Sequence, residues 1–257
     1  MIDSSLFPDL AKRLPIGIMG SAFYPFRSCD STQAEAIRLA ASGAPEGSVV
    51  VTDLQTEGRG RLGRSWWGEA GSSLLVSVLL RPAIPVARLP HFPLLGAVAA
   101  REALKNVTNL PIFIKWPNDL LVHRKKVVGI LAEAGSADGR ILHVVIGIGV
   151  NVCQTSFPPE LTERATSLML AGGASFSREA TLEALLRSLD QWYRIYLEAG
   201  FSPVRQAWRQ GAATLGEFVM IPSQGVEGTA TDLDDGGALI VRGRDGRLER
   251  IVSGEIE

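Results

Sequence analysis

The sequence predicts an α+β fold, with a large domain of helices and strands followed by a small domain made of strands alone. Two observations support this division. As far as Gly211, the sequence contains both helical and strand patterns, whereas the rest of the chain contains only short strands separated by the turn sequences "DDGG" and "DG". The length of 257 residues also suits one large domain with a small appendage. We therefore predict domains at residues 1–211 and 212–257.

Two strands between two helices are predicted in the first half of the large domain. The first helix is expected in "STQAEAIRLAASG", where Thr32 and Glu35 have the spacing of a capping box and Gly43 ends the helix. The runs "GSVVVTDL" and "SSLLVSVLL" are rich in β-branched residues or leucine and predict strands. The second helix is expected in "FPLLGAVAAREAL", because Pro93 suits a first turn and apolar residues follow at helical spacing.

Four strands and a long helix are predicted in the second half of the large domain. The strands are "IFIKW", "DLLVH", "KVVGILAEA" and "ILHVVIGIGVNV". The helix runs from Ser177, a suitable N-cap, to Gly200, and its apolar and aromatic stripe is expected to pack in the core rather than bind a cofactor. In the small domain, "EFVMI", "VEGTATDL", "GALIVR" and "RLERIVSG" predict the strands of a small barrel.

Composition and charge argue against several classes of protein. The net charge of −1 disfavours a protein that coats nucleic acid, because phosphate binding needs a surplus of Lys and Arg on one face. No window of about 18 apolar residues is free of charges and turn formers, so no membrane-spanning segment is expected. Cys29 and Cys153 are too few for a disulfide framework, and the N-terminus lacks a secretory pattern. We therefore expect a cytoplasmic protein.

The loop between the first two predicted strands, "TEGRGRLGRSWW", has the composition of an anion-binding site. Its glycines let the backbone approach a ligand, and its arginines are forked donors for phosphate or carboxylate oxygens. These residues are Gly58, Arg59, Gly60, Arg61, Gly63 and Arg64. A solvated basic hairpin tip is the alternative interpretation of such a short motif, and no Walker sequence follows it.

Further polar residues lie at predicted strand ends. "KWPNDLLV" places Lys115, Asn118 and Asp119 around a turn that proline forces, where they could hold a nucleotide phosphate and its magnesium or simply cap the turn. Lys126 begins the strand of "KKVVGILAE", and Asn151 ends the strand of "GIGVN". Each signal is weak alone, because an exposed lysine at a strand edge is usually a solubilising charge.

Taken in chain order, "DSTQ", "TDLQTEGRGRLGRSWW", "KWPNDLLV", "KKVVGILAE" and "IGIGVNV" resemble the motif series of the biotin protein ligase family, also called biotin–[acetyl-CoA-carboxylase] ligases. The resemblance runs from about Ser28 to the end of the chain. It implies a catalytic domain of the class II synthetase and biotin–lipoate ligase type, with a mixed β-sheet flanked by helices. It also implies that the C-terminal domain is a small SH3-like β-barrel.

The activity that this resemblance implies explains the composition of the loop. The protein would activate biotin with ATP to biotinyl-5′-AMP and transfer biotin to a specific lysine of a biotin carboxyl carrier protein of acetyl-CoA carboxylase. No enzyme nucleophile is needed, so the protein must position two anions, neutralise phosphate charge and exclude water. A glycine–arginine loop that orders over the ligand would do all three.

The resemblance also assigns ligands and partners. Biotin and ATP would be substrates, Mg²⁺ would be the metal, and no bound organic cofactor is expected. The expected macromolecular partner is the biotin carboxyl carrier protein, with no nucleic acid and no membrane, and a homodimer is left open. About 30 residues precede "STQ", which is too few for a winged-helix DNA-binding domain, so we expect the monofunctional type of the family.

The site residues follow from the same resemblance. Those assigned to catalysis are Lys126, which is the first choice, Arg59 and Arg61. Those assigned to biotin are Ser31, Thr32, Gln33, Gln55, Arg59, Gly60, Arg61, Lys126, Gly129 and Gly147. Those assigned to ATP are Arg61, Arg64, Trp66, Lys115, Asn118, Asp119 and Asn151, with Asn118 and Asp119 as the Mg²⁺ contacts through ATP.

Two residues depart from the family pattern, and two other functions stay open. The family usually has Asn at the position of Gln33 and a small residue at the position of Glu57. A lipoate or octanoate protein ligase would use the same chemistry on another acyl group. A non-catalytic module that senses biotin or a nucleotide would be expected to lack part of the catalytic set, yet Arg59, Arg61 and Lys126 are all present.

Overall fold

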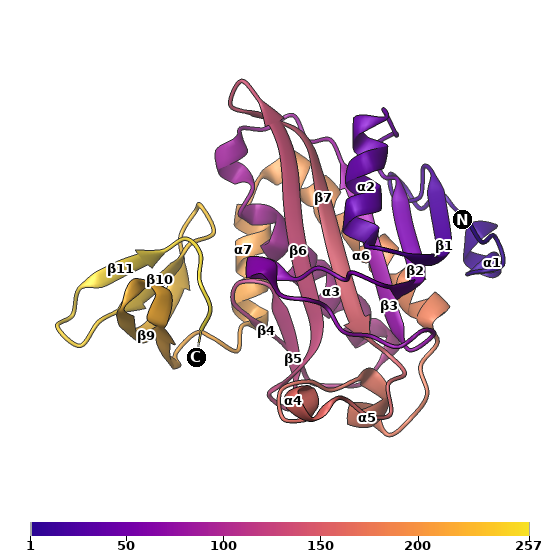
Figure 1. The fold of residues 1–257 in the computed structure, drawn as a ribbon. Helices are drawn as coiled ribbons and strands as arrows, with labels where there is room; N and C mark the ends of the chain where they lie inside the picture. The colour runs from indigo at the N-terminus through magenta and orange to yellow at the C-terminus, as the bar shows by residue number, and fades with distance from the viewer. Residues whose placement is uncertain (1, 257) are drawn as a thin grey trace.

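The computed structural model describes residues 2–256, which form two sheets and the helices around them (Figure 1). The large domain contains a seven-stranded sheet in the order β1-β2-β3-β7-β6-β5-β4, and the C-terminal part contains a four-stranded sheet in the order β11-β10-β9-β8. β1 and β2 are parallel, whereas the other neighbouring strands are antiparallel. The predicted α+β class, with a mixed sheet and a separate C-terminal strand domain, is confirmed.

The strands are β1 (Phe23–Cys29), β2 (Val49–Gln55), β3 (Ser73–Leu80), β4 (Ile112–Lys115), β5 (Asp119–Val122), β6 (Lys125–Ala137), β7 (Arg140–Asn151), β8 (Phe218–Ile221), β9 (Val226–Leu233), β10 (Leu239–Arg242) and β11 (Leu248–Ile251). The α-helices are α1 (Pro8–Ala11), α2 (Thr32–Ala41), α3 (His91–Val107), α4 (Pro159–Thr162), α5 (Leu168–Gly172), α6 (Arg178–Ala199) and α7 (Ser202–Gly211). Within residues 2–256, none of the helices combines the length and the apolar character needed to cross a membrane.

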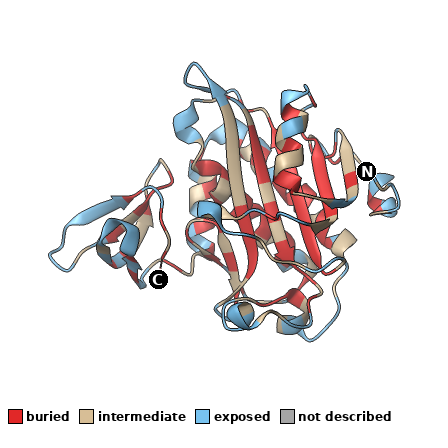
Figure 2. Ribbon diagram, in the orientation of Figure 1, coloured by how far each residue is buried: buried red, intermediate tan, exposed pale blue. Residues whose placement is uncertain are grey.

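The two faces of the large sheet are covered by different helices (Figures 1 and 2). Successive residues of a strand point to opposite faces, so Val50, Leu79 and Val145 pack against Ala36 and Ala40 of α2. The neighbouring residues of the same strands face the main hydrophobic core, which includes the buried sides of α3 and α6. The long antiparallel strands β3, β7 and β6 form the middle of the sheet. They provide a rigid base for the side chains and loops on the α2 side of the sheet.

Helix α2 begins beside its predicted position, but the predicted capping box is wrong. Ser31 is the N-cap, and no side chain caps the first turn. Thr32 instead donates from its backbone N and from Oγ1 to Oε1 of Gln55, at 2.8 and 3.0 Å. Glu35 pairs with Arg38 at 2.7 Å. The contact between Thr32 and Gln55 fixes the start of α2 to the end of β2, two segments that the resemblance assigns to one site.

The other elements mostly agree with the prediction. Helix α6 starts after the N-cap Ser177, which accepts a hydrogen bond from the backbone N of Ala180, and it ends at Gly200. Helix α3 starts at His91 rather than at the predicted Phe92. Strand β1 and helices α1, α4, α5 and α7 were not predicted from the sequence. All four predicted strands of the C-terminal part are present as β8 to β11.

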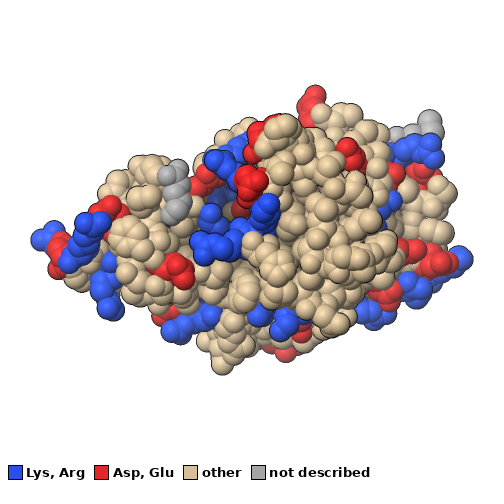
Figure 3. Space-filling view, turned by 90° about the horizontal axis from the view of Figure 1, so that it is seen from below, with Lys and Arg blue, Asp and Glu red and all other residues tan. Residues whose placement is uncertain are grey.

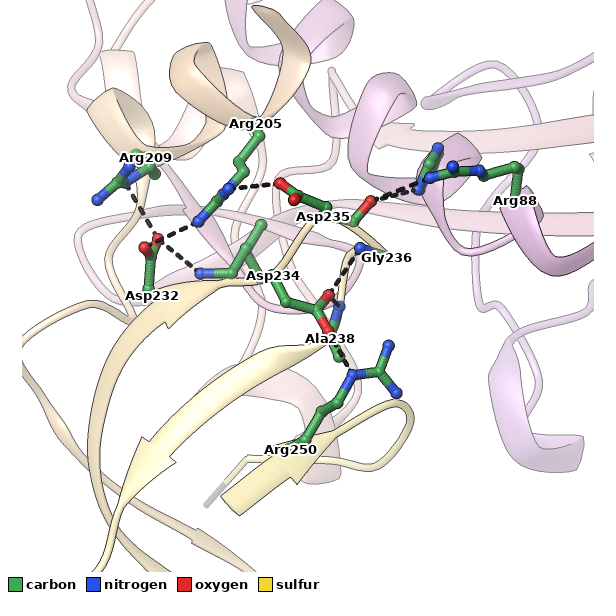
Figure 4. Close-up of polar contacts among 11 residues, drawn as sticks. Arg88, Arg205, Arg209, Asp232, Asp234, Asp235, Gly236, Ala238 and Arg250 are labelled. Carbon is green, nitrogen blue, oxygen red and sulfur yellow. Dashed lines mark hydrogen bonds and ion pairs between the residues drawn. The ribbon is translucent and has the colours of Figure 1, made fainter. Parts of the chain in front are cut away.

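The turn between β9 and β10 joins the C-terminal sheet to the large domain (Figure 4). Arg205 of α7 pairs with Asp232 at 3.0 Å and with Asp235 at 2.7 Å. The backbone carbonyl of Asp235 accepts hydrogen bonds from Arg88 at 3.4 Å and from Nε2 of His91 at 3.1 Å. Burial lowers the pKa of His91 to about 4, so the ring is neutral at pH 7 and its proton is on Nε2. Ion pairs and buried hydrogen bonds therefore fix this turn.

Candidate active site

A hollow opens on the α2 side of the large sheet, where the loop between β2 and β3 crosses β6 and β7. Its walls come from α2, β2, β3, the loop, the turn between β4 and β5, and the two central strands β6 and β7. The lining residues are Ser31, Thr32, Gln33, Gln55, Arg59, Gly60, Arg61, Trp66, Leu75, Val76, Ser77, Asn118, Lys126, Gly129, Ile130, Leu131, Gly147, Ile148 and Gly149. The fold thus brings the separate sequence motifs together in one place.

One end of the hollow is polar and uncharged. Gln33 donates from Nε2 to the carbonyl of Val145 at 3.1 Å, and its Oε1 lies 3.2 Å from Oγ of Ser77. Ser77 also lies 2.9 Å from Oγ1 of Thr32. Oγ of Ser31 is buried and has no hydrogen-bond partner within residues 2–256. Because buried hydroxyl groups in native proteins are normally paired, this end has a place for a polar ligand group.

Glycines of β6 and β7 form the floor of the hollow. A Cβ atom on Gly149 would lie 2.6 Å from Cε2 of Trp66, and one on Gly129 would lie 2.6 Å from Cζ3 of the same ring. A Cβ on Gly147 would lie 2.5 Å from Oε1 of Gln33. Only glycine fits at these three positions without movement of a neighbour. The loop therefore packs the Trp66 indole against the glycines at the centre of the sheet.

The other end of the hollow is cationic. Nζ of Lys126 lies 2.7 Å from Oδ1 of Asp119 and 5.6 Å from the centre of the Trp66 ring. Arg61 donates from Nη1 to Oδ1 of Asn118 at 3.0 Å. Burial lowers the pKa of the Arg61 guanidinium, and the charge of Asp119 opposes this effect. Two cations beside a single carboxylate can bind an anionic group and can stabilise negative charge that develops on it.

The outer side of the loop meets the end of the chain. Arg61 donates from Nη1 and Nη2 to the carbonyl of Gly254, both at 3.4 Å, and Arg64 forms an ion pair with Glu255. Arg64 and Glu57 line a second, more open hollow on this side. Figure 3 shows Lys and Arg side chains gathered with acidic side chains near the junction of the two domains. The loop is thus in contact with both domains.

Most of the predicted site residues line the first hollow. They are Ser31, Thr32, Gln33, Gln55, Arg59, Gly60, Arg61, Trp66, Asn118, Lys126, Gly129 and Gly147. Four others lie outside its lining. Asp119 reaches the hollow through its ion pair with Lys126, and Arg64 lines the second hollow. Lys115 is the last residue of β4 and pairs in the sheet with Asp119.

Asn151, the fourth residue outside the lining, uses both sides of its amide within the protein. Its Nδ2 donates to the carbonyl of Thr166 at 3.0 Å, and its Oδ1 accepts from Gln154 at 3.1 Å. It is buried at the end of β7. In this conformation Asn151 braces the strand that carries Gly147 and Gly149. Its predicted contact with ATP stays a prediction.

Several lining residues were not predicted from the sequence. They are Leu75, Val76, Ser77, Ile130, Leu131, Ile148 and Gly149. Ser77 is the polar member of this set, and its only signal in the sequence was a hydroxyl inside the apolar run of residues 74–80. The rest lie in apolar strand segments, where a core residue and a residue that contacts a ligand have the same pattern.

Comparisons with known proteins agree with this architecture. The sequence model of the Biotin/lipoate A/B protein ligase family matches residues 26–151, and that of the Biotin protein ligase C terminal domain matches residues 214–257. The bifunctional ligase/repressor BirA of Bacillus spizizenii is 39% identical over 231 residues, which are 88% of this chain and 71% of that protein. The biotin–[acetyl-CoA-carboxylase] ligase of Paracoccus denitrificans is 34% identical over 85% of this chain and 93% of its own length.

A solved structure gives the same result. The biotin protein ligase from Aquifex aeolicus in complex with biotin and ATP superimposes with a TM-score of 0.79 at 31% identity, covering 92% of this chain and 98% of that one. The fold and the hollow thus define a ligase of the biotin and lipoate class. Within that class, the match to the C-terminal domain and the identities to the named relatives are decisive: the chain belongs to the biotin protein ligase family.

Proposed function

We propose that the first hollow binds biotin and ATP side by side, and that the protein attaches biotin to a lysine of a biotin carboxyl carrier protein in two steps. In the first step, a carboxylate oxygen of biotin attacks the α-phosphorus of ATP, and pyrophosphate leaves. In the second step, the lysine amine attacks the carbonyl carbon of biotinyl-5′-AMP, AMP leaves and the amine loses a proton. The observation that carries this proposal is the presence of a neutral polar end, a glycine floor and a cationic end in one hollow.

The neutral end suits the bicyclic ring of biotin. A ureido group has two N–H donors and a carbonyl acceptor, so it needs hydroxyl and amide partners rather than charges. Such partners are offered by Ser31, Thr32, Gln33 and Gln55. The buried hydroxyl group of Ser31 has no hydrogen-bond partner within residues 2–256. Gly129, Gly147 and the backbone at Gly60 leave room for the ring and its chain. The longer side chain of Gln33 is accommodated because Gly147 has no Cβ.

The cationic end would hold the reacting groups. Arg59 and Arg61 draw the biotin carboxylate and the α-phosphate together, although the two anions repel each other. Lys126 is placed to bridge them, since a compact ammonium group can follow the charge that develops on the phosphorus oxygens in the transition state. Asp119 holds that ammonium group at 2.7 Å, which keeps it aimed into the hollow. Catalysis would then consist of positioning and electrostatic stabilisation.

The nucleotide would lie between the loop and the turn after β4. Trp66 offers an aromatic face, and Arg64 reaches the triphosphate, with Lys115, Asn118, Asp119 and Asn151 in supporting roles. Among residues 2–256, no group of three His, Cys, Asp or Glu side chains could hold a metal by itself. We expect the oxygens of Asn118 and Asp119, which contact Arg61 and Lys126 in the structure, to contact a Mg²⁺ ion that is bound mainly by the phosphates of ATP. Such an ion would supply charge neutralisation.

The loop would close over the adenylate and exclude water until the acceptor arrives. The contacts of Arg61 with Asn118 and Gly254 would hold the loop at both edges. We place the catalytic domain at residues 1–211 and the barrel at residues 212–257. We assign the reaction to the cytoplasm, with no membrane or nucleic-acid partner, and leave a homodimer as a prediction.

Transfer to a carrier domain tests this function. The protein is incubated with ATP, Mg²⁺, biotin and a purified biotin carboxyl carrier domain, and the mass of the carrier is measured. We expect one biotinyl group per carrier, and none on a carrier in which the acceptor lysine is replaced by arginine. A lipoyl domain with lipoate serves as the comparison. Modification of the lipoyl domain alone would overturn the assignment.

A further inference from the structure

The end of the chain supplies groups that bind the arginines of the loop. Gly254 offers its backbone carbonyl to Arg61, and Glu255 offers its carboxylate to Arg64. Both residues follow β11 and belong to the C-terminal domain, whereas the loop belongs to the large domain. The loop that we assign to phosphate binding therefore already has an anionic partner within the protein.

The segment with Glu255 is anchored on the C-terminal domain. Gln224 donates from Nε2 to the carbonyl of Ser253, and Ile256 is buried. Gly254 has φ +144, a conformation that residues with side chains rarely adopt, and a Cβ on it would lie 2.9 Å from Cγ2 of Ile221. Glycine is thus needed for the turn that directs Glu255 toward the loop.

The C-terminal domain is itself fixed against the large domain. Asp232 and Asp235 pair with Arg205 of α7, and Nε1 of Trp116 donates to the carbonyl of Gly237 at 3.4 Å. Figure 4 shows Asp232 of β9 and Asp235 of the β9–β10 turn facing Arg205 of the large domain. Because the domain is held at this turn, Glu255 is delivered to the loop by a defined surface and not by a free tail.

A guanidinium group that is paired with a carboxylate has to leave it before it can pair with a phosphate in the same way. We propose that Glu255 occupies Arg64 in place of the nucleotide phosphates, so that the triphosphate of ATP must displace Glu255 when it binds. The carboxylate keeps the empty loop near its binding position and at the same time weakens the apparent affinity for ATP. This inference rests on the proposed function, because it takes Arg64 as a ligand of the triphosphate.

The size of the effect follows from the exposure of the pair. The side chains of Arg64 and Glu255 are 67% and 35% exposed. Exposed ion pairs are weak, so Arg64 is paired with Glu255 in only part of the protein molecules. The apparent affinity for the triphosphate is reduced in proportion to the fraction of molecules in which Arg64 is free to bind it. Removing the charge of Glu255 should therefore tighten binding of the triphosphate about two- to fivefold, and the gain should shrink as salt screens the pair.

The experiment measures binding of a non-hydrolysable ATP analogue to the whole protein by calorimetry, with Mg²⁺ and without biotin. Glu255→Gln is expected to lower the dissociation constant, and Glu255→Asp, which keeps the charge, should stay closer to the unaltered protein. Glu249→Gln, an exposed residue of β11, is the matched control and should have no effect. In an Arg64→Gln background, Glu255→Gln should no longer tighten binding, because the guanidinium group for which Glu255 and the phosphates compete is absent.

The results separate this inference from the proposed function. An unchanged or larger dissociation constant in Glu255→Gln would overturn the inference, as would an equal gain in the Arg64→Gln background. The mass of the carrier after biotin transfer tests the function independently. If transfer occurs and the binding result is negative, only the competition by Glu255 fails. If Glu255→Gln tightens binding of the analogue as expected but no biotin is transferred to the carrier, the function fails instead.

Discussion

Lys126 carries the strongest chemical expectation at the scale of single residues. Its ammonium group is held by Asp119 at the cationic end of the hollow. Lys126→Ala should slow adenylate formation by about a hundredfold or more, since a catalytic charge aimed at developing phosphate charge contributes about 3 kcal/mol or more. Lys126→Arg should restore activity only partly, because a planar fork does not replace a compact ammonium. Single-turnover assays measure the rate, and thermal unfolding checks that the fold is intact.

A rate near that of the unaltered protein in folded Lys126→Ala would contradict the catalytic role. Lys126 would then be a strand-edge charge paired with Asp119, the simpler interpretation of its sequence context. Lys125, the preceding residue, provides the matched control. It contacts the carbonyl of Thr162 and lies outside the hollow, so Lys125→Ala should keep full activity.

Arg61 is expected to retain the adenylate more than to form it. It bridges Asn118 and Gly254 in the structure, so it ties the loop to both sides of the hollow. Loss of one charge-assisted contact costs about 1.5–3 kcal/mol, which corresponds to roughly ten- to a hundredfold faster escape of the intermediate. Biotinyl-5′-AMP released by Arg61→Gly should label lysines of serum albumin present in the reaction. Unlabelled albumin with undiminished adenylate synthesis would assign retention to Arg59 or Trp66 instead.

Single residues also show what the sequence could and could not reveal about the site. Arg61 and Lys126 were identified because their motifs, taken in chain order, resemble those of a known family, although each signal alone was weak. Ser77 was missed because its contact with Thr32 depends on the packing of α2 over β3. Asn151 follows two glycines of a recognisable motif, yet its amide binds Thr166 and Gln154 in the structure. Which way a side chain points was not encoded in its local pattern.

At the scale of elements, the glycine floor of β6 and β7 controls how the loop sits. Gly149→Ala would place a Cβ 2.6 Å from the Trp66 ring, so the indole must move away from the sheet. We expect a cost of about 1–3 kcal/mol to the closed loop, and therefore faster tryptic cleavage at its arginines and weaker biotin binding. Gly243→Ala is the control, because its nearest atom is the exposed Oδ1 of Asp245, 3.0 Å away. Equal cleavage rates in both variants would show that the floor does not seat the loop.

The predicted elements were most accurate where one pattern dominated. The β-branched or leucine-rich runs of β2 and β3 and the apolar stripe of α6 were found because the order of apolar residues in each segment indicates which side chains are buried. β1 was missed because Pro25 interrupts it, which an edge strand tolerates and a central strand does not. The capping box at α2 failed because Thr32 bonds to Gln55, a residue of another element. Long-range contacts thus override local signals near the site.

At the scale of the whole molecule, the junction between the domains predicts a dependence of stability on pH. His91 is buried at this junction, and burial lowers its pKa from 6.5 to about 4. As the pH falls below 6.5, His91 takes up a proton in the unfolded chain but stays neutral in the folded protein until the pH approaches 4. Stability is therefore lost as the pH falls from 6.5 toward 4. The loss from this group should approach roughly 3 kcal/mol. Above pH 6.5 the group contributes no pH dependence.

Denaturant unfolding at pH 7 and at pH 4.5 measures this effect. His91→Gln should lose less stability between the two values than the unaltered protein, even if it is less stable at both. His123→Asn is the control, since His123 has positive φ and asparagine tolerates that conformation. If His91→Gln and the unaltered protein lost equal stability between pH 7 and pH 4.5, the imidazole of His91 would not be the cause of the pH dependence.

The central claim is that one hollow activates biotin with ATP before any acceptor is present. Biotin-dependent exchange of labelled pyrophosphate into ATP tests it most directly, because exchange requires reversible formation of biotinyl-5′-AMP on the protein. We expect exchange with biotin and Mg²⁺ in the absence of any carrier protein, and none when biotin or Mg²⁺ is omitted. Exchange that appeared with lipoate and not with biotin would contradict it.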